Sequence, residues 1–167
     1  MQQKEFVNWV VSTLKAGEEQ NKRSVEKKAA AYGITDKTLV KELTELAIVK
    51  CAREIAHHPL SMSQKFDLIV QLYDRQVNLS HRTSHSILLQ QYSTPAPVAY
   101  LAGLFCGLDQ LQFTDGFCFE PSAGNGSLTI AAIPGRVFVN EIDPVRNHNL
   151  QVQNFAAVQR KDRKSVV

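Results

Sequence analysis

The sequence predicts an α/β protein in which a helical bundle precedes the beginning of a doubly wound parallel sheet. Apolar residues recur at helix spacing through most of the first half, residues 1–88. Two short apolar runs in the second half end in acids, at Glu120 and at Glu141, and a Gly-x-Gly turn follows the first run. We therefore expect a helical domain over residues 1–88 and a partial sheet domain over residues 89–167, with an incomplete sheet.

Four helices are expected in the first part of the chain. The first has an apolar face made of Phe6, Trp9, Val10, Thr13 and Leu14, and Gly17 is a plausible stop. The second runs from about Ser24 to Ala31 and ends near a glycine. The third begins within 35–38 and continues to about residue 57, and the fourth is capped by Ser61 or Ser63.

Two binding interpretations compete with a plain bundle in this part. Ala29, Gly33 and Leu39 have partly the spacing of a DNA-binding helix-turn-helix, but no cluster of groove-reading side chains follows the turn. His81 and His85 have the i, i+4 spacing of a helix face, yet no cysteine or acid is placed to complete a zinc site. We therefore favour a plain helical bundle and predict no metal site.

Composition and charge narrow the class of protein. The net charge of +3, from 19 basic and 16 acidic residues, is too mild to indicate nucleic-acid binding by itself. The cysteines, Cys51, Cys106 and Cys118, are odd in number and widely spaced, which suits a reducing cytoplasm. No apolar run reaches transmembrane length, and the first residues do not form a signal peptide. We expect a soluble, cytoplasmic protein without membrane contact.

The most informative segment is Phe117–Thr129, which predicts a strand, a tight turn and a helix in that order. The strand ends at Glu120, and the turn contains Gly124 and Gly126. Glycines let the backbone approach a ligand closely and adopt φ > 0 without steric cost. A helix that starts there presents unpaired N–H groups to a polar ligand. This pattern is typical of a nucleotide-binding loop.

The residues around the glycines restrict which nucleotide this loop can bind. A dinucleotide fingerprint needs a third small residue, where this chain has Thr129. A phosphate-binding Walker loop needs a lysine after Gly126, and none is present. The acid Glu120 repels a phosphate but suits a ligand that carries positive charge. S-adenosylmethionine carries both an α-amino group and a sulfonium, so it fits this loop. A lone Gly-x-Gly is just as compatible with an ordinary turn that binds nothing, and the neighbouring segments decide between the two.

A second strand and helix follow the loop. Val137–Val139 is an apolar, β-type run, as expected for a buried parallel strand. Glu141 lies 21 residues after Glu120 and is placed to accept hydrogen bonds from ribose hydroxyls. Asp143 precedes Pro144, so it is equally suited to be the N-cap of the next helix.

A third segment, ahead of the glycine loop, also bears on binding. The run Gln90–Pro95 precedes a helical pattern in which Val98, Leu101 and Phe105 share a face. On spacing alone, Thr94 is best interpreted as the N-cap of that helix.

Together the three segments resemble the start of N6-adenine-specific DNA methyltransferases. The resemblance rests on Tyr-Ser-Thr-Pro at 92–95, Glu-Pro-Ser-Ala-Gly-Asn-Gly at 120–126 and Asn-Glu-Ile-Asp-Pro at 140–144. Within this family the chain is similar to the group whose cofactor motifs precede the catalytic motif, as in type I modification subunits and methylases of mobile elements. The resemblance covers roughly residues 88–155 and implies a Rossmann-like, S-adenosylmethionine-dependent methyltransferase domain.

The resemblance also implies a set of cofactor-binding residues. The segment that closes over the methionine end of the cofactor corresponds to Tyr92, Ser93, Thr94 and Pro95. The first strand end and its loop correspond to Glu120, Pro121, Ser122, Ala123, Gly124, Asn125 and Gly126. The ribose-binding acid corresponds to Glu141, with Ile142 or Asp143 beside the adenine ring.

The catalytic motif of that family, Asn/Asp-Pro-Pro-aromatic, has no counterpart, because the chain contains no Pro-Pro. No catalytic residue is therefore assigned, and we expect the chain alone not to methylate. DNA is the expected partner of the complete enzyme, with a second copy or a specificity subunit as further partners. The alternatives are a non-catalytic DNA- or subunit-binding helical module with a vestigial loop, and a methyltransferase for another substrate.

The expected sheet is too small to be stable by itself. The sequence clearly predicts only two strands. The tail 160–167 could contribute the acid of a third strand, Asp162, but a charged, solvated tail is the better prediction for this segment. Three explanations remain open: a fragment, a sheet completed by a partner chain, or strands that pack on the amino-terminal helices. We expect a truncated gene product or the product of a shifted reading frame.

Overall fold

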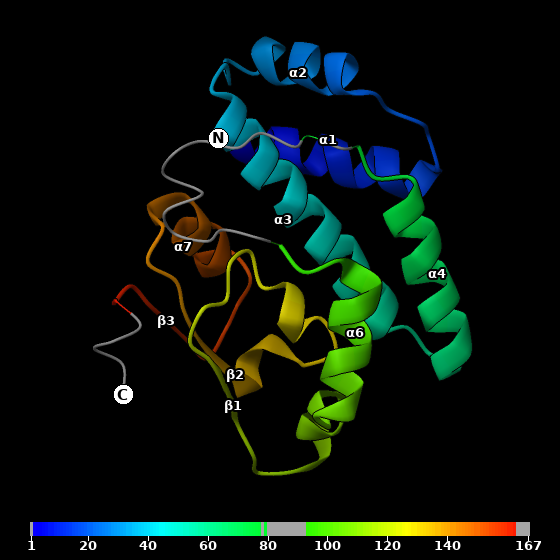
Figure 1. Ribbon diagram of the computed structural model, residues 1–167, viewed down its shortest axis with the longest axis vertical. Coiled ribbons are helices and arrows are strands. Elements are labelled where there is room, and N and C mark those ends of the chain that lie inside the picture. Colours follow the sequence, from blue (N-terminus) through cyan, green and yellow to red (C-terminus); the bar gives the residue numbers. More distant parts are fainter. Residues whose placement is uncertain (1, 78, 80–92, 163–167) are drawn as a thin grey trace.

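The computed structural model describes residues 2–77, 79 and 93–162, and it is a mixed α/β structure. Helices make up the first part of the chain, and a small parallel sheet lies in the second part (Figure 1). The predicted α/β class is confirmed at this level. Tyr92, His81 and His85 fall outside the described residues, so their predicted roles stay predictions.

The four predicted amino-terminal helices are confirmed. They are α1 (Gln2–Ala16), α2 (Lys22–Ala31), α3 (Lys37–Ala56) and α4 (Met62–Asp74). Helices α2 and α4 each begin with a capping box, at Asn21 and at Ser61, and the Asp36 side chain caps α3. Ser61 rather than Ser63 is therefore the cap of α4, and Gly17 follows α1 with a φ of 70°.

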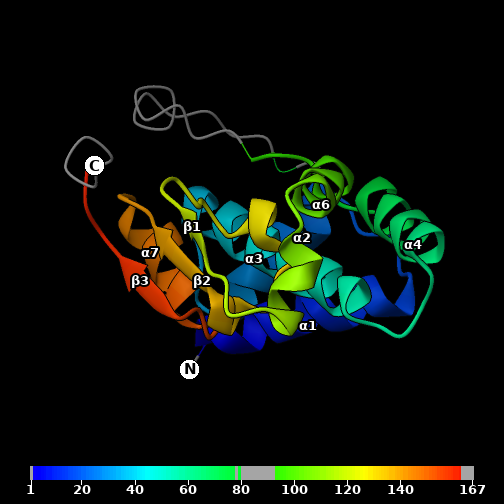
Figure 2. The same cartoon turned by 90° about the horizontal axis from the view of Figure 1, so that it is seen from below.

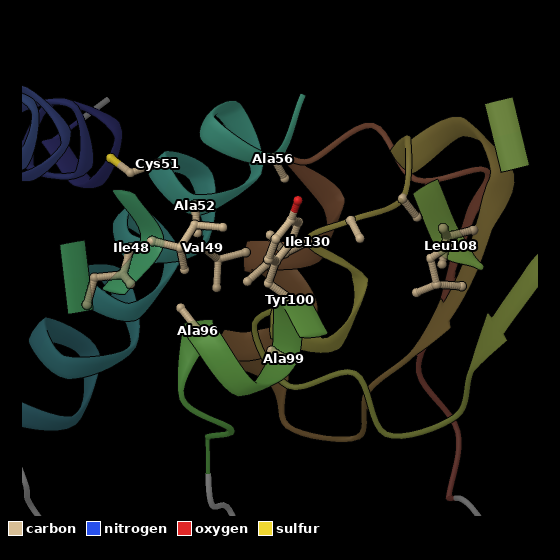
Figure 3. Packing of buried hydrophobic residues seen from close by; sticks show 14 of the residues in the cluster. Ile48, Val49, Cys51, Ala52, Ala56, Ala96, Ala99, Tyr100, Leu108 and Ile130 are labelled. Carbon is tan, nitrogen blue, oxygen red and sulfur yellow. The ribbon is translucent and has the colours of Figure 1, made fainter. Parts of the chain in front are cut away.

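Helix α3 runs through the middle of the molecule and contributes to two apolar cores (Figure 1). One core joins it to α1 and α2, around Phe6 and Leu43. The other joins it to α4, to α6 (Ala96–Phe105) and to the strands, with Val49, Tyr100 and Ile130 close together (Figure 3). The strands thus pack on the amino-terminal helices, and the burial of most of α3 favours the bundle over the helix-turn-helix interpretation.

Three short strands form an all-parallel sheet in the order β1-β2-β3. They are β1 (Cys118–Glu120), β2 (Val137–Asn140) and β3 (Ala157–Gln159), and Phe119 is in register with Phe138. Strand β3 confirms that a third strand is present, which was the weaker of the two predictions for this part of the chain. It ends just before the basic tail that begins at Arg160. Val137 and Val139 point into the core with no exposed surface, whereas Phe119 and Phe138 on the other face are half-exposed.

Short helical segments precede the first strand and connect the strands. They are η1 (Leu108–Phe113), η2 (Ser127–Thr129), η3 (Pro134–Arg136) and α7 (Pro144–Gln151), and α7 lies beside β3 (Figure 2). The helix predicted after the glycine loop is wrong, because η2 is a single 3₁₀ turn. Only seven residues separate Gly126 from Pro134, and one or two turns cannot offset the cost of helix nucleation. The loop therefore has no helix N-terminus to offer a ligand.

The prediction that Thr94 caps the following helix is also wrong. Pro95 occupies the N-cap position of α6, without a side-chain hydrogen bond. Pro97 in the first turn suits a helix start there, because a proline at that point needs no N–H partner.

The predicted division between residues 88 and 89 lies outside the described residues, and the second core joins helices from before it to strands from after it. None of the helices that the structure describes is long and apolar enough to cross a membrane.

Candidate functional site

The glycine loop and the end of β2 meet at the carboxyl edge of the sheet. The Ala123 N–H donates to the Asn140 carbonyl at 2.9 Å, which fixes the loop to β2. The Asn140 side chain is fully buried and donates to the carbonyls of Pro121 and Lys161, at 3.0 and 3.1 Å. This amide ties the ends of all three strands together, because Pro121 follows β1 and Lys161 follows β3.

Glu141 and Gly124, both predicted to bind cofactor, lie in direct contact. Oε2 of the buried Glu141 accepts a hydrogen bond from the Gly124 N–H at 2.8 Å, and Oε1 accepts one from the Asp143 N–H at 2.9 Å. Gly124 has a φ of 56°, a conformation that glycine adopts without steric cost. A ribose hydroxyl that approaches Glu141 meets a carboxylate already engaged by two backbone donors, with lone pairs remaining on each oxygen.

The other predicted acids have local partners. Oε1 of the half-buried Glu120 accepts from the Ser122 N–H at 2.9 Å, so this carboxylate holds the first part of the loop. Asp143 is the N-cap of α7 and accepts from the N–H groups of Val145 and Arg146, at 2.9 and 3.0 Å. The N-cap interpretation of Asp143 is thereby confirmed, while the exposed Ile142 beside it lies free of the core.

Sequence reasoning missed a buried polar network behind the loop. The Asn125 side chain, 3 % exposed, donates to Oε2 of Glu42 at 2.8 Å and to Oε2 of Glu45 at 2.9 Å. It also accepts from Asn149 of α7 at 2.9 Å. Helix α3 therefore holds the glycine loop through Asn125, in addition to the contact between the loop and Glu141. The run of amides in and after α7, which includes Asn149 and Gln153, is the one sequence signal of this network.

An ion pair lies at the centre of this network. Nε and Nη2 of Arg146 contact the two carboxylate oxygens of Glu42 at 2.8 and 3.3 Å, and both side chains are 4 % exposed. Burial acts to lower the pKa of Arg146, but the hydrogen bond and charge of Glu42 outweigh it, so that the pKa is raised. The fork geometry and the burial make this the strong form of ion pair.

A second buried arginine supports the other glycine. Arg53 of α3 donates to Thr129 Oγ1 at 2.9 Å and to the Gly126 carbonyl at 3.4 Å. Burial lowers the pKa of Arg53 to about 10. A Cβ at Gly126, whose φ is 92°, would lie 3.3 Å from atoms of both Gln153 and Phe155. Glycine is therefore favoured at this position for two reasons: the backbone has a positive φ, and the neighbouring side chains leave little room for a Cβ.

The segment before α6 reaches the same network. Ser93 Oγ donates to Oε2 of Glu45 at 2.5 Å, and this is the oxygen that accepts from Asn125. Ser93 and the loop, which are predicted to contact the same cofactor, are therefore linked through one carboxylate of α3.

Two cavities lie beside α3. One of about 230 Å³ lies between α1, α3 and α4, where it borders Cys51. The other, of about 360 Å³, lies between α1, α3 and α7, where it borders Lys50, His148 and Asn149 of the polar network. Within 2–77, 79 and 93–162, no group of three or more His, Cys, Asp or Glu side chains is arranged to hold a metal ion.

Comparison of the chain with protein-family models, with curated proteins and with solved structures gave no match. The interpretation of this site therefore depends on its own geometry and chemistry.

Proposed function

We propose that this chain is the amino-terminal and cofactor-binding part of an S-adenosylmethionine-dependent, adenine-specific DNA methyltransferase, with a Rossmann-like domain. One observation carries the proposal: the loop after β1, the acid after β2 and the segment before α6 are linked at one edge of a parallel sheet. Open α/β sheets bind nucleotides outside the carboxyl ends of their strands.

Each group has a role in this proposal. Glu120 pairs with the α-amino group of the cofactor, and the backbone from Gly124 to Gly126 approaches its methionine part. Glu141 accepts the ribose hydroxyls, and Ile142, 42 % exposed, contacts the adenine ring. In the complete enzyme the bound cofactor would supply its methyl group to the amino nitrogen of an adenine extruded from the duplex, with S-adenosylhomocysteine and a proton as the other products. The missing Pro-Pro motif makes this chain a binder that does not transfer the methyl group.

Isothermal titration with S-adenosylmethionine tests the proposal. We expect saturable binding to the wild-type chain and a Kd at least tenfold higher for Glu141→Gln, since hydrogen bonds to a charged group contribute about 1.5–3 kcal/mol. Glu54→Gln is the matched control, because Glu54 is an exposed acid of α3 whose partner is Lys15 at 2.6 Å. Absence of saturable heat with folded protein at millimolar cofactor would refute the proposal.

The alternative is a non-catalytic DNA- or subunit-binding helical module with a vestigial loop. The contact between Gly124 and Glu141 favours it, because each group satisfies the other without a ligand. In that case neither the wild type nor the Glu141→Gln variant gives saturable heat with S-adenosylmethionine. Titration with duplex DNA then tests whether the chain binds DNA.

A further inference from the structure

Glu45 of α3 joins two segments that lie far apart in the sequence. Its Oε2 accepts hydrogen bonds from Ser93 Oγ at 2.5 Å and from Asn125 Nδ2 at 2.9 Å. Ser93 lies just before α6, and Asn125 lies between the two glycines of the loop. One oxygen atom thus fixes the separation of the two segments.

We propose that Glu45 is a positioning residue that holds the segment before α6 and the glycine loop in register for one ligand. This inference rests on the proposed function, in which both segments contact the cofactor. Glu45 acts through Ser93 and Asn125 and need not touch the ligand itself.

The surroundings of Glu45 suit this role. Helix α3 is buried along most of its length, so it offers a rigid base for a side chain that contacts two segments outside regular helices and strands. The Glu45 side chain is 21 % exposed, and two cations flank it, with Lys41 Nζ at 3.6 Å and Arg146 Nη2 at 4.0 Å. Partial dehydration strengthens its hydrogen bonds, and the flanking cations offset the cost of burying its charge.

Amide hydrogen exchange tests the role without any ligand. The Gly124 and Gly126 amides, which donate to Glu141 and to the Ala123 carbonyl, report on the loop. The Ala99 amide, which donates to the Pro95 carbonyl, reports on the start of α6. In Glu45→Ala we expect exchange at both sites to rise on the order of tenfold, because two hydrogen bonds to a charged group are lost.

Three comparisons make this result specific. Glu45→Gln keeps one carbonyl oxygen at the bridging position, so we expect it to recover most of the protection at both reporter sites. Glu54→Ala removes an exposed acid from the same helix and should leave both sites at the wild-type rate. Amides of α1 serve as the internal reference, since a general loss of stability would speed them equally. Unchanged loop amides in Glu45→Ala, or a change at the loop without one at Ala99, would overturn the inference.

Titration with S-adenosylmethionine separates this inference from the proposed function. If wild type binds, Glu45→Ala should raise the Kd about tenfold and Glu45→Gln less, whereas an unchanged Kd in Glu45→Ala overturns the positioning role. If wild type gives no saturable heat, the proposed function fails, and the exchange rates still decide whether Glu45 couples the two segments.

Discussion

Removing one partner of the buried ion pair between Glu42 and Arg146 should cost far more stability than removing one partner of the surface ion pair on the same helix. In the first pair both side chains are 4 % exposed, and the closest contact is 2.8 Å. In the second pair Lys15 and Glu54 approach to 2.6 Å, but their side chains are 49 % and 59 % exposed. The substitutions Glu42→Gln and Glu54→Gln therefore remove the same charge from α3 in two opposite environments.

The expected difference follows from burial. Removing one partner of a buried pair costs about 3–5 kcal/mol, because the remaining charge is left without compensation. We expect about 3 kcal/mol for Glu42→Gln, at the low end of that range, since the Glu45 carboxylate stays 4.0 Å from Arg146. An exposed pair contributes about 0–1 kcal/mol, so Glu54→Gln should lie within about 1 kcal/mol of wild type. For a chain of this size the loss at Glu42 corresponds to a Tm lower by roughly 6–12 °C.

Urea unfolding of wild type and the two variants gives both free energies, and a thermal melt gives the Tm. The slope of the free energy with urea should stay constant, so that the change reflects the native state. If Glu42→Gln costs no more than Glu54→Gln, the ion pair does not hold α3 to α7, and our account of the network is wrong. A double variant, Glu42→Leu with Arg146→Met, removes both charges and should recover much of the loss.

Two further predictions concern the loop and the cysteines. Gly126→Ala should lower the free energy of unfolding by about 1–3 kcal/mol, because alanine is strained at positive φ, and its Cβ would lie 3.3 Å from neighbouring side chains. Gly135→Ala is the control for urea unfolding, because no atom lies within 4 Å of a Cβ there. Burial raises the pKa of Cys51 to about 11, so roughly one part in a thousand is thiolate at pH 8. Iodoacetamide should therefore label the exposed Cys106 long before Cys51, as followed by peptide mass spectrometry; equal rates would contradict the buried position of Cys51.

The helices and their ends were predictable because their signals are local. Ser61 and its partner three residues later form a capping box, and Asp143 before Pro144 marks a helix start. The same local reasoning was wrong at Thr94, where the choice between adjacent cap positions depends on how Pro97 fits the first turn. It was also wrong after Gly126, where the distance to the next proline is too short for a helix.

The polar network behind the loop was not predictable, because its members come from three distant parts of the chain. Glu42 and Glu45 alternate with the apolar residues of α3. In the sequence alone this spacing is typical of acids on the solvent-facing side of a helix. Their burial arises only when Asn125 and Arg146 are brought against α3 by the packing of the sheet. Of the candidate site, the sequence therefore predicts the side that is proposed to face a ligand, while the supporting side depends on tertiary contacts.

The contact between Gly124 and Glu141 bears on how tightly the proposed cofactor binds. Gly124 N–H and Glu141 Oε2 already contact each other at 2.8 Å, so in the proposed complex a ribose hydroxyl uses a lone pair that remains on this carboxylate. The ribose contact therefore supplies part of the proposed affinity rather than all of it. The rest of the proposed affinity comes from the ammonium of the cofactor at Glu120 and from its adenine on Ile142. Weak binding that depends on both ends of the cofactor is therefore the expected behaviour, and adenosine alone should bind more weakly than S-adenosylmethionine.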